Sequence, residues 1–164
     1  MPKGTPYRWL DLAALCRRLL PNDEISRIRY FTALVSARPD DPQGPQRQLT
    51  YLRALRTIPN LSIHTGHYVS HPVRMRLANP PPSGPATVAA VVISNDSDLK
   101  EPITVAQHGL GLTVGIINPH PPRRRSRALQ PTFFKQIRES ALRTCQFPAV
   151  LADADGKIHK PARW

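Results

Sequence analysis

A strand–helix–strand pattern between residues 88 and 118 is the feature that most constrains the fold. Residues 88–94 are almost continuously apolar, as in a strand covered on both faces. Apolar residues between 99 and 110 then recur at helical spacing, and residues 112–118 again have the composition of a strand. Two strands joined by a helix at these lengths form a parallel pair with a right-handed crossover. The sequence therefore predicts an α/β fold with a mostly parallel sheet flanked by helices.

Other elements are expected to be short, because 19 prolines interrupt the chain. Apolar spacing predicts helices at residues 10–20, 46–57 and 126–142, and β-branched and aromatic content predicts strands at residues 28–35 and 61–69. The proline-rich segment 79–85 is expected to be an extended connector. The chain length suits one domain, which we place at residues 1–145, with a C-terminal tail at 146–164.

The charge balance favours a polyanionic partner. The chain has 23 Lys and Arg against 11 Asp and Glu, a net charge of +12, and RNA is the first candidate. The alternative is that the excess arginine only keeps the surface soluble. No apolar run is long enough to cross a membrane and the start resembles no signal peptide. Cys16 and Cys145 are isolated, which argues against disulfides and favours the cytoplasm.

Two aspartates directly follow the first strand of this pattern. Residues i and i+2 of a strand point to the same side, so Asp96 and Asp98 could converge at the carboxyl end of the strand, where α/β sheets bind ligands. Two close carboxylates favour a cation, and Mg²⁺ or Mn²⁺ would suit them. The alternative is that these acids cap the following helix.

Candidate phosphate-binding residues lie on the same side of the expected sheet. After the strand at 112–118 the chain runs into an arginine-rich turn, in which the candidates are Arg123, Arg124, Arg125 and Arg127. A solvated arginine run is the alternative. Asn118 could orient a water or a phosphate, although capping a turn is the commoner role of such a residue. Ser94 and Asn95, which lead into the acid pair, complete the expected nucleic-acid-binding set.

The segment VVISNDSDL resembles the strand-and-turn motif of NYN domains, which belong to the PIN-like nuclease superfamily. The similarity to bacterial members extends in order along nearly the whole chain. It includes the segments TPYRWLDLAALCRRLLP, RIRYFTALV, RQLTYLRALRTIPNLSIHTGHY, GLTVGIINPH and FPAVLADADGKIHKPARW.

The resemblance implies a Rossmann-like fold in which acidic residues at strand ends bind Mg²⁺ or Mn²⁺ for RNA cleavage. Asp96 and Asp98 match the later acidic pair of that motif and would be the catalytic metal ligands. Two parts of the family pattern have no counterpart here: the opening strand that ends in Asp-Gly-x-Asn, and the helix headed by Ser-Asp-Val before the second acidic motif. We therefore expect a truncated or internally deleted member, or the product of an incorrect gene model.

The missing helix leaves two alternatives for the sheet. Parallel neighbours need a crossover of a dozen or more residues, and the proline-rich segment is too short for one. Either the strands pair differently or the fold is incomplete, and an uncovered sheet edge would favour homo-oligomers. For function, the first hypothesis is an NYN-type metal-dependent RNA endonuclease with reduced or lost activity. The second is a catalytically silent RNA-binding or protein-interaction module with a basic surface.

Overall fold

The computed structural model describes residues 6–66 and 89–162, which divide into two compact units. The terminal unit is built from both ends of the chain, residues 6–66 and 139–162, and the middle unit from residues 89–138. The expected strand extension at 67–69 and the connector at 79–85 lie outside the described residues.

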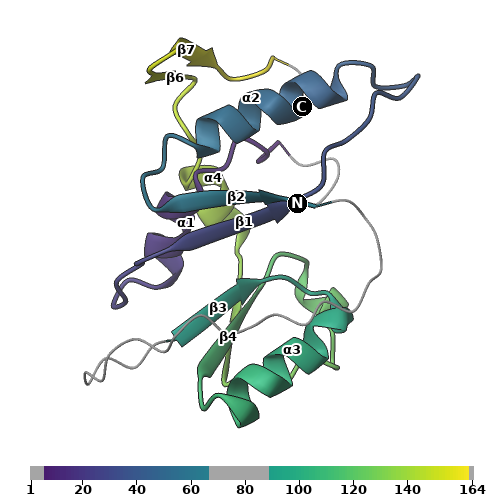
Figure 1. Ribbon diagram of the computed structural model, residues 1–164, viewed down its shortest axis with the longest axis vertical. Coiled ribbons are helices and arrows are strands. Elements are labelled where there is room, and N and C mark those ends of the chain that lie inside the picture. Colours follow the sequence, from purple (N-terminus) through teal and green to yellow (C-terminus); the bar gives the residue numbers. More distant parts are fainter. Residues whose placement is uncertain (1–5, 67–88, 163–164) are drawn as a thin grey trace. The chain divides into compact units, whose positions relative to one another are not determined.

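The terminal unit contains two helices, a parallel strand pair, a further short helix and a hairpin (Figure 1). Its elements are α1 (Leu12–Leu19), β1 (Ile28–Thr32), α2 (Gly44–Leu55), β2 (Leu61–Thr65), α4 (Glu139–Thr144), β6 (Val150–Asp153) and β7 (Gly156–His159). The first four confirm the elements expected from the periodicity, with shorter strands than the sequence predicts.

Strands β1 and β2 are joined by α2, the crossover that a parallel pair requires. Their register runs from Ile28 opposite Leu61 to Thr32 opposite Thr65. Burial alternates along β1 and along β2 as far as His64, so one face packs inward and the other faces solvent. On the inner face, the ring of Tyr30 meets Tyr51 of α2 edge to face at 6.3 Å.

The core of this unit is centred on Trp9, which is fully buried. Its indole Nε1 donates to the carbonyl oxygen of Pro148 at 2.8 Å, and its ring packs against Tyr51 and Phe147. The Tyr51 hydroxyl donates to the buried carbonyl oxygen of Leu10 at 2.8 Å. These contacts join segments from the two ends of the chain into one core.

The expectation that residues 146–164 form a tail is wrong for residues 146–162, which the structure describes. Phe147 and Ile158 are buried, and β6 and β7 form an antiparallel hairpin in which Gly156, at φ +107°, is the first residue after the turn. Arg53 of α2 holds the hairpin, because its guanidinium Nε and Nη2 donate to the Asp153 carboxylate at 2.7 and 2.5 Å. The strands are too short to show clear alternation in sequence, and long-range packing supplies their stability.

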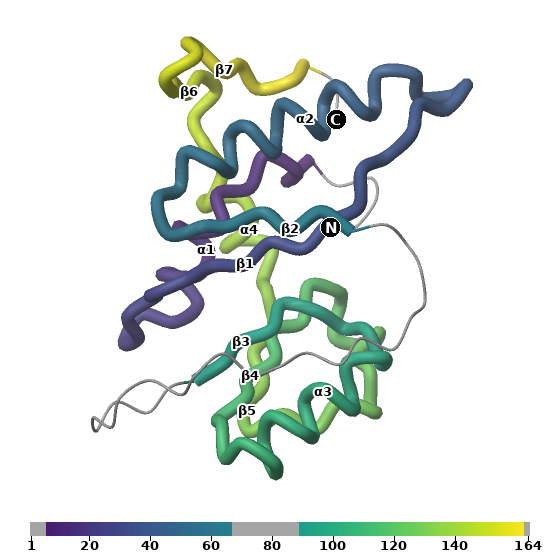
Figure 2. Tube along the Cα trace, viewed as in Figure 1, coloured from purple at the N-terminus to yellow at the C-terminus, as the bar shows by residue number. Residues whose placement is uncertain are grey.

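The middle unit is a three-stranded parallel sheet with the order β3-β4-β5 (Figure 2). Its elements are β3 (Ala89–Ile93), η1 (Ser97–Leu99), α3 (Lys100–Thr104), η2 (Val105–Gly109), β4 (Thr113–Asn118), η3 (Pro122–Arg124) and β5 (Phe133–Gln136). The strand–helix–strand prediction is confirmed. Ile103 of α3 packs on Val114 and Ile116 of β4, with Leu129, to form the core of this unit.

The helix expected at residues 126–142 is wrong up to residue 138, and only residues 139–142 are helical, as part of α4. Residues 133–136 form β5, which pairs parallel to β4 from Gly115 opposite Phe133 to Asn118 opposite Gln136. The spacing of Phe133, Phe134 and Ile137 resembles a helical stripe, but pairing with the buried strand β4 satisfies the backbone of this segment instead. The arginine-rich segment 119–132 is therefore the crossover between β4 and β5.

The sequence left open how the strands on either side of the proline-rich segment could be parallel neighbours without a crossover helix. The described strands do not pair in that way. β2 pairs with β1, and β3 pairs with β4 in another sheet, so the described part of the chain contains no β2–β3 ladder. The α/β class with parallel sheets flanked by helices is confirmed. A Rossmann-like or PIN-like arrangement stays a prediction. Within residues 6–66 and 89–162, no helix combines the length and apolar character that a bilayer crossing needs.

Candidate nucleic-acid interface

Asn95, at the end of β3, holds the arginine-rich crossover by both ends of its side-chain amide. Its Nδ2 donates to the carbonyl oxygen of Arg124 at 2.6 Å, and its Oδ1 accepts from the backbone N–H of Ser126 at 2.7 Å. The side chain thus bridges the two loops that follow β3 and β4. It brings the start of the acidic motif and the arginine turn together at the carboxyl ends of neighbouring parallel strands.

Asp96 is the N-cap of the helical segment that begins at Ser97. Its Oδ1 accepts from the backbone N–H of Asp98 at 3.1 Å, and the Ser94 hydroxyl accepts from the N–H of Asp96 at 3.1 Å. Both Asp96 and Asp98 are exposed. The capping alternative is therefore confirmed for Asp96, because one of its carboxylate oxygens is engaged by the helix it starts.

The described residues contain no group of three or more His, Cys, Asp or Glu side chains that could hold a metal ion. The Mg²⁺ or Mn²⁺ site expected from the sequence would depend on Asp96 and Asp98 alone. Mg²⁺ can be held by one or two carboxylates when substrate phosphates and waters supply the remaining oxygens. The metal therefore stays a prediction, with Asp98 as the acid whose carboxylate does not cap the helix.

Asn118 lies in the interior and not on the expected binding face. It is fully buried, its Nδ2 donates to Oε1 of Gln136 at 3.0 Å, and its Oδ1 accepts from the N–H of His120 at 3.0 Å. Gln136 in turn donates to the carbonyl oxygens of Asn118 and His120 at 3.0 and 2.6 Å. This pair closes the turn after β4, which is the capping role that the sequence left open for Asn118.

The four candidate arginines are all exposed: Arg123, Arg124, Arg125 and Arg127. Among the residues that the structure describes, none of them forms a salt bridge with a carboxylate. The guanidinium carbon of Arg125 lies 3.7 Å from the centre of the Phe134 ring, a cation–π contact that fixes its position without neutralising its charge.

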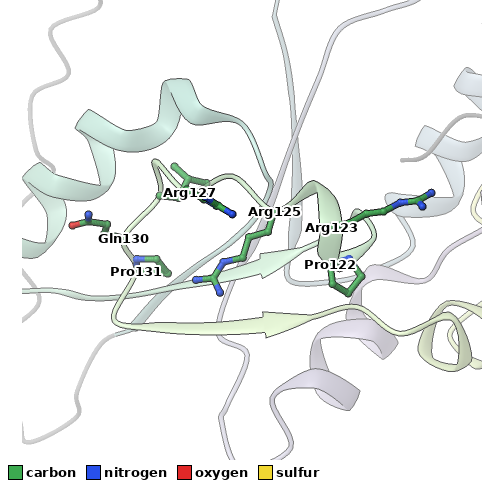
Figure 3. Close-up of a pocket in the computed structure, with 7 residues that line it drawn as sticks. Pro122, Arg123, Arg125, Arg127, Gln130 and Pro131 are labelled. Atoms are coloured by element: carbon green, nitrogen blue, oxygen red, sulfur yellow. The ribbon is translucent and has the colours of Figure 1, made fainter.

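Three of these arginines line a hollow of about 520 Å³ on the crossover between β4 and β5. Its other walls are Pro122, Leu129, Gln130 and Pro131. Figure 3 shows Arg125 extended from the loop toward β5, whereas Arg123, which also lines the hollow, extends in the opposite direction. An open hollow lined by positive groups and an apolar floor suits a phosphate or a phosphate-bearing strand better than an apolar ligand.

Phe134 and Gln136 were missed as parts of this region. Both were assigned to a helix, so their pairing with the strand end and the arginine turn was not foreseen. Alternation of partly buried and exposed positions is absent in β5, whose four residues are all partly buried. A strand of this kind carries little sequence signal, and only its register with β4 locates these side chains.

Comparison with protein-family models, curated proteins and solved structures found no match to this chain. The NYN-like resemblance of the quoted motifs therefore stays a prediction.

Proposed function

We propose that this chain is an RNA-binding module of NYN origin, in which the arginine turn binds the phosphate backbone and nuclease activity is reduced or lost. The observation that carries the proposal is the Asn95 clamp, which holds a turn with four exposed arginines against the end of β3. A solvated arginine run would need no such attachment. Preorganised cations lose less conformational freedom when they engage phosphates.

Arg125 supports phosphate binding by a second route. Its stacking on Phe134 holds the planar guanidinium beside the hollow, and its N–H donors retain their capacity for a bidentate phosphate contact. Salt bridges would compete with RNA for these arginines, and the described residues supply none. The net charge of +12 adds long-range attraction for a polyanion.

The acid pair argues for weak rather than efficient metal catalysis. Metal-assisted phosphodiester hydrolysis usually divides its work among several carboxylates. Here Asp96 uses one oxygen as a helix cap, and Asp98 is the second acid of the pair. A metal bound at this point would polarise a phosphate oxygen and activate water, but the described residues provide no third acid to share that role.

The first experiment measures binding of a labelled single-stranded RNA over a range of salt concentrations. Arg123→Gln/Arg127→Gln removes two charges from the turn while leaving the Asn95 clamp and the Arg125 stack in place. The slope of log K against log salt should become shallower by about 1.4, since each phosphate contact contributes about 0.7 on a single strand. The affinity should fall accordingly.

The matched control is Arg17→Gln/Arg18→Gln, which removes two exposed arginines from α1. This variant has the same net charge as the turn variant, so it separates a local interface from non-specific attraction. Equal losses in the two variants would contradict the proposal and support the alternative of a generally solubilising surface.

A second experiment separates binding from cleavage. The wild type and Asp96→Asn/Asp98→Asn are incubated with the same RNA and increasing Mn²⁺, and Asn at position 96 preserves a capping side chain. We expect binding in both proteins and little or no cleavage in either. Rapid Mn²⁺-dependent cleavage by the wild type alone would show that the two acids suffice and would establish the nuclease hypothesis.

A further inference from the structure

We propose that the exposed face of the β1–β2 pair is a stacking platform for unpaired bases, which makes single-stranded RNA the preferred ligand. This inference rests on the proposed RNA-binding function, and it adds a second contact site, in the terminal unit. It concerns Phe31 and His64, which the sequence did not single out together.

Phe31 and His64 are register partners on adjacent parallel strands. Their rings lie 4.9 Å apart between centroids with an interplanar angle of 23°, so they are stacked. Phe31 is 70% exposed, the most exposed large hydrophobic residue in the described part of the chain. A ring this exposed gains little free energy of folding from burial, and its fixed stack on His64 leaves the other face of the ring open to a ligand.

The His64 ring is further fixed by its strand neighbour. Its Nε2 lies 3.0 Å from the hydroxyl oxygen of Ser62, at hydrogen-bonding distance. His64 therefore has a defined orientation and supports the Phe31 ring from the adjacent strand. A base that stacked on this pair would meet a preorganised aromatic surface, so little conformational entropy would be lost in ordering the two rings on binding.

The charge of this face favours a nucleic acid over an apolar protein partner. Its four solvent-facing strand residues are Arg29, Phe31, Ser62 and His64, a set with one permanent cation and no acid. Aromatic rings stack on bases while a neighbouring arginine contacts the phosphate backbone, which is the usual composition of single-strand platforms. Duplex RNA hides its base faces and could not use the rings.

The test compares three probes: a labelled single-stranded RNA, the same RNA annealed to its complement, and inorganic polyphosphate, which lacks bases. Phe31→Ala should weaken single-strand binding by roughly 5-fold to 150-fold, because stacking is worth about 1–3 kcal/mol per base. Binding of duplex and of polyphosphate should be unchanged. Phe31→Tyr, which keeps a ring, should bind single strands almost as the wild type does.

The matched control is Leu49→Ala, which removes another exposed apolar side chain from the same unit. Phe31 is so exposed that its replacement should not unfold the protein, and a circular dichroism melt checks this. Unchanged single-strand affinity in Phe31→Ala would overturn the platform. The proposed function would still stand if Arg123→Gln/Arg127→Gln lost affinity, and both would fail if neither variant did.

A protein interface is the competing use of this face. The wild type would then show a sedimentation coefficient that rises with protein concentration, whereas Phe31→Ala would not. If Phe31→Ala also left RNA binding intact, this face would be an interface between copies of this chain. That outcome would also overturn the platform.

Discussion

Asn95 and Arg124 are joined side chain to backbone, since the Asn95 Nδ2 donates to the Arg124 carbonyl oxygen over 2.6 Å. The bond ties the loop after β3 to the arginine turn after β4. A substitution at Asn95 therefore tests whether this attachment matters for RNA binding, without changing the charge of the chain.

Asn95→Ala should lower RNA affinity although all four arginines remain. Loss of the bonds to Arg124 and Ser126 frees the turn, so binding must order it again. Each bond contributes about 0.5–1.5 kcal/mol, so loss of the two bonds should lower the free energy of unfolding by roughly 1–3 kcal/mol. Denaturant unfolding and fluorescence anisotropy measure the two effects. Asn22→Ala, which removes an exposed amide away from this crossover, is the control; equal losses in both variants would count against a specific clamp.

Gly115→Ala should destabilise the middle unit. A Cβ at position 115 would overlap the ring of Phe133, its register partner on β5. Overpacking of this kind costs about 1–3 kcal/mol. The double variant Gly115→Ala/Phe133→Leu should recover part of that loss relative to the sum of the single variants. Strict additivity in chemical denaturation would mean that the two residues do not compete for space.

Asp96→Ala should destabilise the helix start more than Asp96→Asn. Removal of the cap leaves the backbone N–H of Asp98 without its acceptor and costs about 1 kcal/mol, whereas an Asn side chain can accept the same bond. Amide hydrogen exchange at residues 97–100 and thermal melts measure the difference. If the two variants were equally destabilised, the carboxylate charge and not the cap would be the important property.

The Arg53–Asp153 pair should make the stability of the terminal unit depend on acid pH. The hydrogen bonds from Arg53 are the main cause that lowers the pKa of Asp153 from its ordinary value. A lowered folded-state pKa gives stability that is complete above the unfolded-state value of about 3.9 and is lost as pH falls through the folded-state pKa. Urea unfolding across this range should therefore show a decline, and Arg53→Met should flatten it. Arg56→Met, beyond the same helix, is the control, and an identical pH profile in wild type and Arg53→Met would refute the assignment.

Local pattern predicted the elements whose side chains repeat with a clear period. The helix α1 ends near Pro21, as expected, and its Asp11 cap accepts from the N–H of Ala14 at 2.9 Å. The continuous apolar runs of β3 and β4 marked strands in a parallel sheet. Capping by Asp96 was also foreseeable, because acidic side chains before a helix commonly accept its first N–H groups.

Periodicity failed where a short segment fits more than one structure. The residues of β5 were assigned to a helix, and those of β6 and β7 to a tail. Strands of four residues contain too few side chains for alternation to be distinguished from helical spacing. Their conformation is selected by partners far along the chain, such as Gly115 for Phe133 and Arg53 for Asp153.

The sequence by itself determined the α/β class, the basic character and the position of the acidic and arginine-rich motifs after strands. Composition and local spacing carry that information because each property depends on residues close together in the chain. Only the tertiary structure decided that Asn118 is buried, that Asn95 clamps the arginine turn and that Phe31 stacks on His64. These depend on which strands pair and in which register, and burial and hydrogen bonding fix that choice over long separations.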